Sequence, residues 1–407
     1  MDEATAPERS AMLGLAALMR MTFENVDLAP LSARLLERAR ADPADADALM
    51  DLSLILQFTG KRDLGLAVQD LALDSSRIYH QRAATAETGL RLLAISAPGD
   101  LTANSPLAPL LEGSDVALTT LYVRAEDRAL DGPVPEHDLA FVTVGESQAN
   151  ARLLENLAQW LEGWPRPILN RPEAILLLSR AAVAARLQGL LGVEVPACVR
   201  AARSTLDAVA SGTRSIAEVL RGAGFPVIVR PLDAHGGHDL ERIERAEALG
   251  AYLARVAHSE FFVAPFVDYR SADGAFRKYR VVCIGGAAYA CHMAISDHWM
   301  IHYLNAGMGE SAAKRAEEAA FMAGFDAGFG LRHRTALAAI AQRIGLDYFG
   351  IDCAESNRGE LLVFEVDPAM IVHAMDPPAL YPYKLPQMRK VFAAFRAMLG
   401  EAARGAS

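Results

Sequence analysis

Three acidic residues stand close together in an otherwise apolar segment near the C-terminus: Asp352, Glu365 and Asp367. Two apolar runs flank a polar turn there, as in a β-hairpin. If the hairpin is centred between positions 358 and 359, Asp352 lies opposite Glu365, and Asp367 shares that face two residues further on. A solvated hairpin face is the alternative, which the flanking phenylalanine, isoleucine and valine residues disfavour. Because buried carboxylates repel one another unless a cation neutralises them, the pattern predicts a Mg²⁺ site.

A basic residue precedes a glycine-containing loop in the middle of the chain. Arg230 stands near the end of the predicted strand 226–231, and the loop after it contains His235, Gly236 and Gly237. Glycine lets the backbone approach a ligand closely, and successive N–H groups can cradle phosphate oxygens. An ordinary strand-to-helix turn is the alternative, because many such turns contain two glycines. The segment predicts a phosphate-binding loop.

Lys278 and Arg280 form a second positively charged segment, at the start of the predicted strand 279–284. Cations at the mouth of a buried strand suit a polyanionic ligand, and arginine can bind a phosphate through two hydrogen bonds. The alternative is a strand edge held by salt bridges. The segment is typical of a site for a phosphate-bearing ligand.

The composition limits the class of protein. The chain has 407 residues, 52% of them hydrophobic, so it can bury large cores, and its length suggests about two to four folded units. Fifty acidic and forty basic residues give a net charge of −10, which disfavours non-specific nucleic-acid binding. Four cysteines without CxxC spacing favour a reducing cytoplasm over a zinc site or a disulfide scaffold. We expect neither a signal peptide nor a membrane-spanning helix, because charges interrupt the long apolar stretches.

The helix and strand signals change at residue 91. Residues 1–90 favour helix after helix, either as a tetratricopeptide-like hairpin or as a small bundle, because apolar residues recur at i, i+3 and i+4. From residue 91 short apolar runs alternate with helical segments, which indicates an α/β layer. The predicted strands are 92–97, 116–123, 139–145, 167–170, 226–231, 261–267, 279–284, 287–292 and the hairpin 348–366, and the predicted helices include 149–162, 172–191, 240–258, 334–344 and 386–403.

Taken in order, these segments resemble the ATP-grasp superfamily of ligases over residues 116–399. The resemblance implies an α/β fold, with an α+β ATP-grasp core behind a preceding α/β layer, and the helical N-terminus is an added all-α domain. The domains expected from it are a helical, tetratricopeptide-like domain (1–90), a pre-ATP-grasp α/β domain (91–195), an ATP-grasp small subdomain (196–266) and a large subdomain with the metal-binding hairpin (267–407).

The resemblance also implies roles for single residues. Arg180 and Arg230 match two positions that touch nucleotide phosphates and are usually lysine in the family. Arg280 matches the arginine that binds the triphosphate. Asp352 and Glu365 match the two magnesium-binding acids.

Further nucleotide contacts follow from the same resemblance. The segment 262–268 is similar to the hinge whose backbone reads adenine, which gives Val267 a place beside the base and makes Asp268 the ribose candidate. Lys278 joins the phosphate-binding residues, and Asp367 stands where the family commonly has asparagine, so that it can still bind metal.

The segment 292–307 resembles the acceptor region of the glutamate-ligase branch of the superfamily. There an asparagine and a basic residue line the phosphate and acceptor site, and Asn305 and His292 take those positions here. Because histidine titrates near neutral pH, a general base in this segment is conceivable, and packing residues are the alternative. Further candidates for the acceptor pocket are His298, Trp299, His302 and Tyr303.

The activity that the resemblance implies is an ATP- and Mg²⁺-dependent ligase, with Mn²⁺ as an alternative metal. It would join a small-molecule or peptide carboxylate to an amine or a thiol through an acyl-phosphate, on an amino acid, a peptide or a protein terminus. The open alternatives are an ATP-grasp phosphotransferase and a non-catalytic nucleotide-binding scaffold. A protein or peptide partner at the helical N-terminus and a homodimer also stay open, whereas nucleic acid and membrane are not expected.

Overall fold

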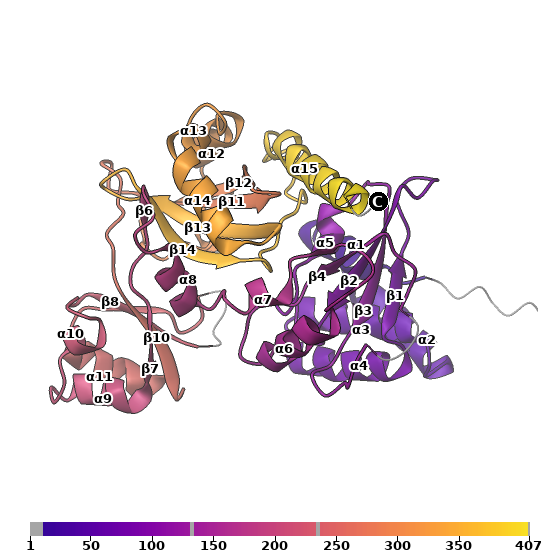
Figure 1. The fold of residues 1–407 in the computed structure, drawn as a ribbon, viewed down its shortest axis with the longest axis horizontal. Coiled ribbons are helices and arrows are strands. Elements are labelled where there is room, and N and C mark those ends of the chain that lie inside the picture. Colours follow the sequence, from indigo (N-terminus) through magenta and orange to yellow (C-terminus); the bar gives the residue numbers. More distant parts are fainter. Residues whose placement is uncertain (1–10, 131–133, 233–236, 406–407) are drawn as a thin grey trace, which may run out of the picture.

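The computed structural model describes residues 11–130, 134–232 and 237–405, which form a mixed α/β fold with three sheets (Figure 1). The first sheet belongs to an α/β layer near the N-terminus, a second, smaller sheet lies at the opposite end, and the third lies between them. The fold class is the one expected from the sequence, with a small antiparallel sheet and a larger, mainly antiparallel sheet behind an α/β layer. No helix in the described ranges is long and apolar enough to cross a membrane.

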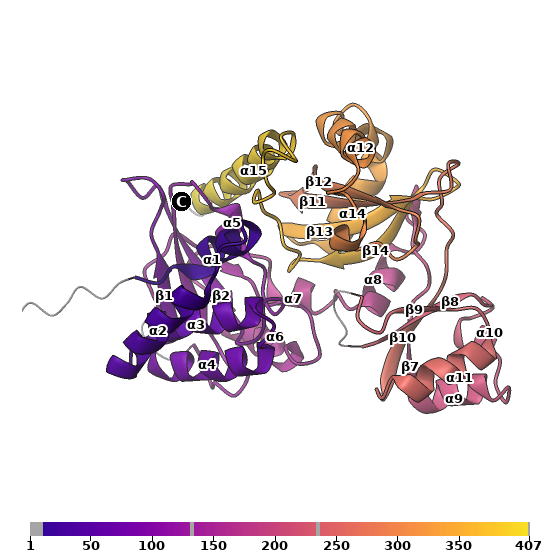
Figure 2. The same ribbon diagram turned by 180° about the vertical axis from the view of Figure 1, so that it is seen from behind.

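Four helices precede the first sheet: α1 (Gly14–Phe23), α2 (Ala29–Ala41), α3 (Ala46–Phe58) and α4 (Arg62–Ser75). They pack on one another and against that sheet, because Met50 and Leu73 share a buried cluster with Tyr79 of strand β1 (Figure 2). The expected separate all-α domain over 1–90 is therefore not distinct from the sheet, and its likeness to a tetratricopeptide hairpin stays a prediction.

Strand β1 (Ile78–Gln81) also lies within the range for which only helices were expected. It pairs antiparallel with β3, and only Tyr79 in it is buried. Four residues of mixed polarity carry too little periodicity to mark a strand in the sequence.

The first sheet has the order β1-β3-β2-β4-β5. The strands β2, β3, β4 and β5 run parallel, and the apolar runs that predicted them are largely buried. Their bounds are β2 (Leu90–Ser96), β3 (Val116–Tyr122), β4 (Leu139–Val142) and β5 (Ile168–Leu169), with the helices α5 (Leu107–Leu110) and α6 (Ala151–Trp160) between them.

The single helix expected over 172–191 is divided into α7 (Pro172–Ile175) and α8 (Arg180–Leu187). Ser179 has an extended backbone and caps α8, because its hydroxyl accepts a hydrogen bond from the N–H of Ala182 at 3.3 Å. The break places Arg180 at the first position of α8.

The small sheet has the order β7-β10-β8-β9 and is antiparallel. Its own buried cluster includes Val229, Tyr252 and Phe261. Strand β9 replaces the beginning of the helix predicted over 240–258, which therefore starts later. The bounds are β7 (Val199–Ala202), β8 (Val227–Pro231), β9 (Glu241–Ile243), β10 (Glu260–Pro265), α9 (Arg203–Ala210), α10 (Ile216–Val219) and α11 (Ala246–Arg255).

The large sheet has the order β12-β11-β13-β14-β6. Rings of Phe141 in the first sheet, Tyr348 in the large sheet and Phe395 in the C-terminal helix contact one another, so these parts share one core. The bounds are β6 (Val193–Glu194), β11 (Phe276–Ile284), β12 (Ala287–Ser296), β13 (Tyr348–Glu355), β14 (Leu361–Asp367), α12 (Ala312–Ala323), α13 (Phe329–Arg332), α14 (Arg334–Ile344) and α15 (Lys384–Arg404), with a 3₁₀ turn at Tyr303–Asn305.

The β13–β14 hairpin confirms the predicted register at the acids. Asp352 pairs with Glu365, and Asp367 pairs with Gly350. Towards the turn the register shifts, because Cys353 pairs with Val363 and leaves Phe364 as an extra residue, a β-bulge. The turn is therefore centred on residue 358, half a residue from the predicted centre, while the acids keep their predicted partners.

The start of α1 is fixed by a buried carboxylate. Asp51 on α3 is 1% exposed and accepts hydrogen bonds from the N–H groups of Leu13 (2.7 Å) and Gly14 (2.9 Å). Burial raises the pKa of Asp51 to about 6. Gly14 has φ +78° and lies so close to Gln81 that a Cβ atom would clash with its side-chain amide. Helix α1 is thus held at its first residues by both α3 and β1.

We expect Asp51→Ala to lower the free energy of unfolding by about 1–3 kcal/mol, because it leaves two N–H donors at the start of α1 without an acceptor. Thermal and urea unfolding measure the loss. Asp63→Ala, on the exposed surface of α4, is the matched control and should leave the stability unchanged. Equal stabilities of the two variants would contradict the anchoring role of Asp51.

Candidate active site

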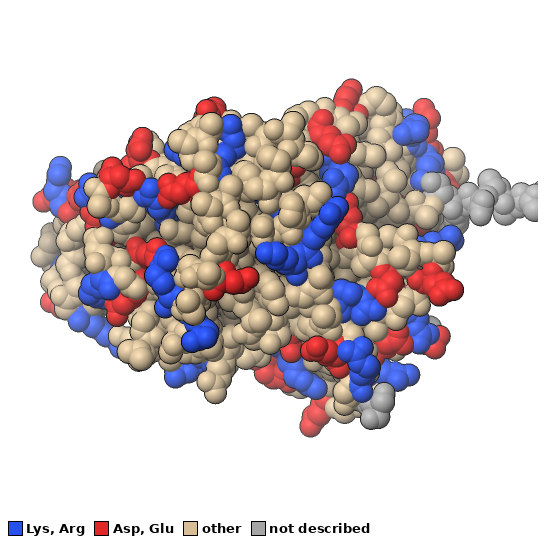
Figure 3. Space-filling view, turned by 90° about the horizontal axis from the view of Figure 1, so that it is seen from above, with Lys and Arg blue, Asp and Glu red and all other residues tan. Residues whose placement is uncertain are grey.

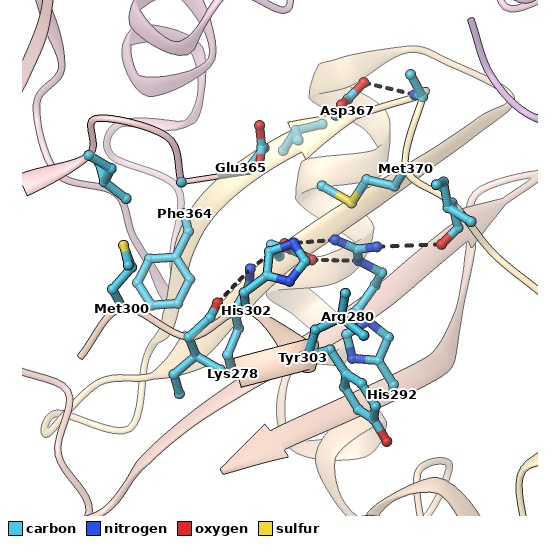
Figure 4. A pocket seen from close by; sticks show the side chains of 18 of the residues that line it. Lys278, Arg280, His292, Met300, His302, Tyr303, Phe364, Glu365, Asp367 and Met370 are labelled. Carbon is cyan, nitrogen blue, oxygen red and sulfur yellow. Dashed lines mark hydrogen bonds and ion pairs between the residues drawn. The ribbon is translucent and has the colours of Figure 1, made fainter. Parts of the chain in front are cut away.

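A cavity of about 1170 Å³ lies between the small sheet, the large sheet, helix α8 and the loop after β14. Most of the site residues expected from the sequence line it, and they come from separate parts of the chain. Figure 4 shows several of them pointing toward one another from the strands of the large sheet and the loop after it. The expected residues that line the cavity are Arg180, Arg230, Gly237, Val267, Lys278, Arg280, His292, Asn305, Asp352, Glu365 and Asp367.

Three expected nucleotide contacts are not part of this group. His235 and Gly236 lie outside the described residues. Asp268 does not line the cavity, and its carboxylate accepts hydrogen bonds from the guanidinium (3.0 Å) and the backbone N–H (3.1 Å) of Arg270. The hydrogen bonds from Arg270 lower the pKa of Asp268. A contact of Asp268 with a ribose stays a prediction and requires Arg270 to move.

The centre of the site is a buried carboxylate between two cations. Asp352 is 1% exposed, and its oxygens lie 2.7 Å from Nε of Arg280 and 2.6 Å from Nζ of Lys278. Lys278 and Arg280 are two residues apart on β11, so they share one face of the strand that pairs with β13. Burial opposes ionisation of Asp352, yet the two cations hold its pKa well below the usual range. Asp352 is therefore ionised and neutralised by its neighbours.

The neighbouring acids differ in their electrostatic state. Glu365 forms an ion pair with Arg180, whose charge lowers the pKa of Glu365 against the effect of burial. Burial and the charge of Glu365 raise the pKa of Asp367 to about 6, although its carboxylate accepts a hydrogen bond from the N–H of Ala369 at 2.7 Å. Arg230, on β8 of the small sheet, is 8% exposed, and burial together with Arg180 lowers its pKa to about 10.

The acids do not form a preformed metal cluster. Within the ranges that the structure describes, no three histidine, cysteine, aspartate or glutamate side chains are grouped to hold a metal ion. Asp352 and Glu365 nevertheless fit Mg²⁺, because they are cross-strand neighbours that present hard oxygen donors to one cavity. Mg²⁺ takes one or two carboxylates together with phosphate oxygens. The third ligand expected at Asp367 stays a prediction.

Two of the residues expected at the acceptor side, His292 and Asn305, have different surroundings. His292 lines the cavity and packs its ring edge-on against Tyr303 at 4.8 Å, and burial and Arg280 keep its pKa well below 6.5, so it is neutral at pH 7. The side-chain oxygen of Asn305 accepts a hydrogen bond from the N–H of His302 at 2.9 Å, which stabilises the 3₁₀ turn. Trp299 also lines the cavity, whereas His298 does not.

Several cavity residues escaped the sequence analysis, among them Lys384, Asp376, His373 and Phe23. A signal existed for Lys384, because it is in phase with the buried apolar face of α15 (Met388, Val391, Phe395, Met398). Lys384 is 5% exposed, and a lysine is rarely buried without a partner.

We expect Asp352→Asn to lower the free energy of unfolding by about 3 kcal/mol, because it leaves two partly buried cations without their counter-charge. Glu360→Gln in the turn of the same hairpin is the matched control, because Glu360 pairs with the exposed Arg358, and it should lose at most about 1 kcal/mol. Chemical unfolding of both variants measures the difference. Equal losses would contradict a central role for Asp352.

No protein-family model and no curated protein matches the chain. Among solved structures the chain is similar to D-alanine–D-alanine ligase from Bacillus anthracis complexed with ATP, with 14% identity, a TM-score of 0.45, and coverage of 77% of this chain and 97% of that chain. It is also similar to a RimK domain protein ATP-grasp from Sphaerobacter thermophilus, with 17% identity, a TM-score of 0.41 and coverage of 77% and 99%. At these identities and TM-scores the likenesses assign no activity to this chain.

Proposed function

We propose that this chain is an ATP- and Mg²⁺-dependent ligase that joins a carboxylate to an amine through an acyl-phosphate. One observation carries the proposal: four cations from α8, β8 and β11 surround the ionised Asp352 and Glu365 in a single cavity between two sheets. The four are Arg180, Arg230, Lys278 and Arg280. A triphosphate with its metal ion matches this alternation of charges.

The cations would bind the phosphates by exchanging partners. Arg180 now neutralises Glu365, and Lys278 and Arg280 neutralise Asp352. Phosphate oxygens would take over these cations, and arginine would bind them with two hydrogen bonds each. Asp352 and Glu365 would then be free to hold Mg²⁺, which supplies neutralisation of the charge on the transferred phosphoryl group.

The apolar part of the cavity near the small sheet suits the base of the nucleotide. Ile228, Phe262 and Val267 line it, and the ring of Phe266 packs edge-on against Trp299 at 5.8 Å. The guanidinium of Arg242 lies 4.0 Å from the centre of the Phe266 ring, a cation–π contact that stabilises the position of this ring. A flat aromatic base would bury its faces against such side chains.

The proposed reaction has two steps, formation of an acyl-phosphate and its attack by the amine. An oxygen of the carboxylate forms a bond to the γ-phosphorus of ATP while the bond to ADP breaks. The amine nitrogen then forms a bond to the acyl carbon, the bond to phosphate breaks, and the amine loses a proton. The buried site contributes charge neutralisation and excludes water that would hydrolyse the acyl-phosphate.

Two measurements test the proposal. Mg²⁺ with a non-hydrolysable ATP analogue at 100 times its dissociation constant should stabilise the protein by about 2.7 kcal/mol. ADP release with a panel of carboxylates should be accompanied by hydroxamate when hydroxylamine is added, because only an acyl-phosphate is trapped in this way. Binding without ADP release would favour a scaffold, ADP release without hydroxamate would favour a phosphotransferase, and no binding at millimolar analogue would refute a nucleotide site.

We expect Arg230→Ala to weaken binding of the Mg²⁺-bound ATP analogue by about 10- to 100-fold, the effect of losing a charge-assisted hydrogen bond. Arg230→Lys should recover part of that affinity, because it keeps the charge but not the bidentate geometry. Arg358→Ala, at the exposed tip of the hairpin, is the control with unchanged affinity. Calorimetric titration measures all three, and an unchanged affinity for Arg230→Ala would contradict its contact with phosphate.

A further inference from the structure

One end of the cavity is built from segments that lie far apart in the sequence. Met19 and Phe23 of α1 line it together with His373 in the loop after β14, and the rings of Phe23 and His373 are 4.5 Å apart. Asp376 and Lys384 line the same part, where burial lowers the pKa of His373 while the charge of Asp376 opposes this. Helix α1 thus contributes side chains to the site as well as covering the first sheet.

This end connects to the cationic centre through a series of contacts. The ring of His292, which lies opposite Arg280 in the β11–β12 pair, packs against Tyr303. The hydroxyl of Tyr303 accepts a hydrogen bond from Nζ of Lys384 at 2.6 Å, and that Nζ lies 3.3 Å from Asp376. His292 and Tyr303 therefore link the Arg280 centre to the Lys384–Asp376 pair. Figure 4 shows the rings of His292 and Tyr303 beside Arg280.

The charges at this end do not cancel. Lys384 has two carboxylate neighbours, Asp376 and Glu318, the latter at 3.6 Å. Glu318 is fully buried and saturated, because it accepts hydrogen bonds from Tyr303 (2.8 Å), Tyr383 (2.7 Å) and the N–H of Met293 (3.1 Å). Lys384 is a single cation shared by two carboxylates, so this group of three carries one formal negative charge in excess. Asp376 lines the cavity and its side chain is 16% exposed, so it is the carboxylate of the two that a ligand can reach.

The side chains around Asp376 are mainly apolar. They come from α1, from the loop after β14 and from α15, and they leave room beside the carboxylate for a hydrocarbon group of the ligand. The apolar residues that line this end are Met19, Phe23, Met370, Leu380 and Met388.

From this combination we infer that the end of the cavity at Asp376 binds the amine substrate as its ammonium ion, with an apolar side chain against Phe23 and Met19. The ammonium ion gives one proton to the Asp376 carboxylate before its nitrogen attacks the acyl carbon, and the second proton leaves after the C–N bond has formed. The inference rests on the proposed ligase function and adds the substrate class: an α-amino compound with an apolar side chain. A free amino acid and the first residue of a peptide share this chemistry. Helix α1 is then a specificity element, because Phe23 determines which side chain is accepted.

The test measures binding of four probes to the full chain with Mg²⁺ and the ATP analogue: L-leucine, L-leucinamide, the peptide Leu-Gly-Gly and N-acetyl-L-leucine. The first three carry an ammonium group and the last does not. We expect N-acetyl-L-leucine not to bind. Tight binding of leucine alone identifies a free amino acid, whereas binding of the amide and the peptide identifies a peptide terminus. Equal binding of N-acetyl-L-leucine, or no binding of any of the four, overturns the inference.

Variants of two residues separate the contribution of the Asp376 charge to amine binding from that of the apolar Phe23 ring. Asp376→Asn should weaken binding of the ammonium probe by about 10- to 100-fold, because it removes a charge-assisted hydrogen bond. Phe23→Ala should weaken leucine binding about 10-fold or more and leave glycine binding unchanged, since only the apolar side chain touches the ring. Phe23→Leu, which keeps most of the apolar volume, should recover leucine binding and shows that a loss in Phe23→Ala is not a folding defect.

The ATP analogue provides an independent readout in the same titrations. If wild type binds the analogue but neither variant changes the affinity for the amine, the inference is wrong and the proposed function stands. If the analogue does not bind, the proposed function fails. Titration of the amines without nucleotide then shows whether the Asp376 site exists in its own right.

Discussion

The ion pairs of Asp352 with Lys278 and Arg280 are the interaction on which the site depends. They lie between the two central strands of the large sheet, and a buried carboxylate is tolerated there only because both cations are present. Under the proposed function, phosphate oxygens would replace the carboxylate as the partner of each cation, and Mg²⁺ would have to replace the cations as the partner of Asp352, because the carboxylate would otherwise be left buried without a counter-charge. The residues that neutralise the buried Asp352 are therefore the same ones to which we assign the phosphates. Acidic and basic side chains are interspersed over the face of the molecule that Figure 3 shows.

Part of this arrangement could be predicted from the sequence, because it depends on patterns within a single strand or hairpin. The pairing of Asp352 with Glu365 followed from the period of two in a hairpin, and it held because a bulge at Phe364 compensates for a turn displaced by half a residue. The buried parallel strands of the first sheet were predictable because each apolar run is short and most are followed by turn residues such as glycine and proline, which favours a strand over a helix. Short strands such as β1 and β9 were not, since three or four residues carry no usable pattern.

The ion pairs themselves could not be predicted, because they join residues that are distant in the sequence. Arg180 and Glu365 are 185 residues apart, and Arg280 and Asp352 are 72 residues apart. Only tertiary packing decides that Asp352 faces two cations instead of a metal cluster. Buried charges on apolar helix faces were the accessible signal: Lys384 on α15 and Glu318 on α12 both stand in phase with buried apolar residues. Such residues report a polar network even when its members are unknown.

Both ends of helix α1 are held by contacts with other parts of the chain. Asp51 fixes the first residues of α1 on α3, and Gly14 allows the close approach to β1, so the other end of α1 is held at the cavity where Phe23 meets His373. Contacts at both ends restrict the movement of α1 along and across the surface of the protein, so the position of Phe23 in the cavity is fixed. The cavity then has three parts in sequence: an apolar wall at the small sheet, a cationic centre, and an anionic end at Asp376. A ligand set that pairs a base, a triphosphate and an ammonium ion complements all three, whereas a second anionic substrate at Asp376 would be repelled.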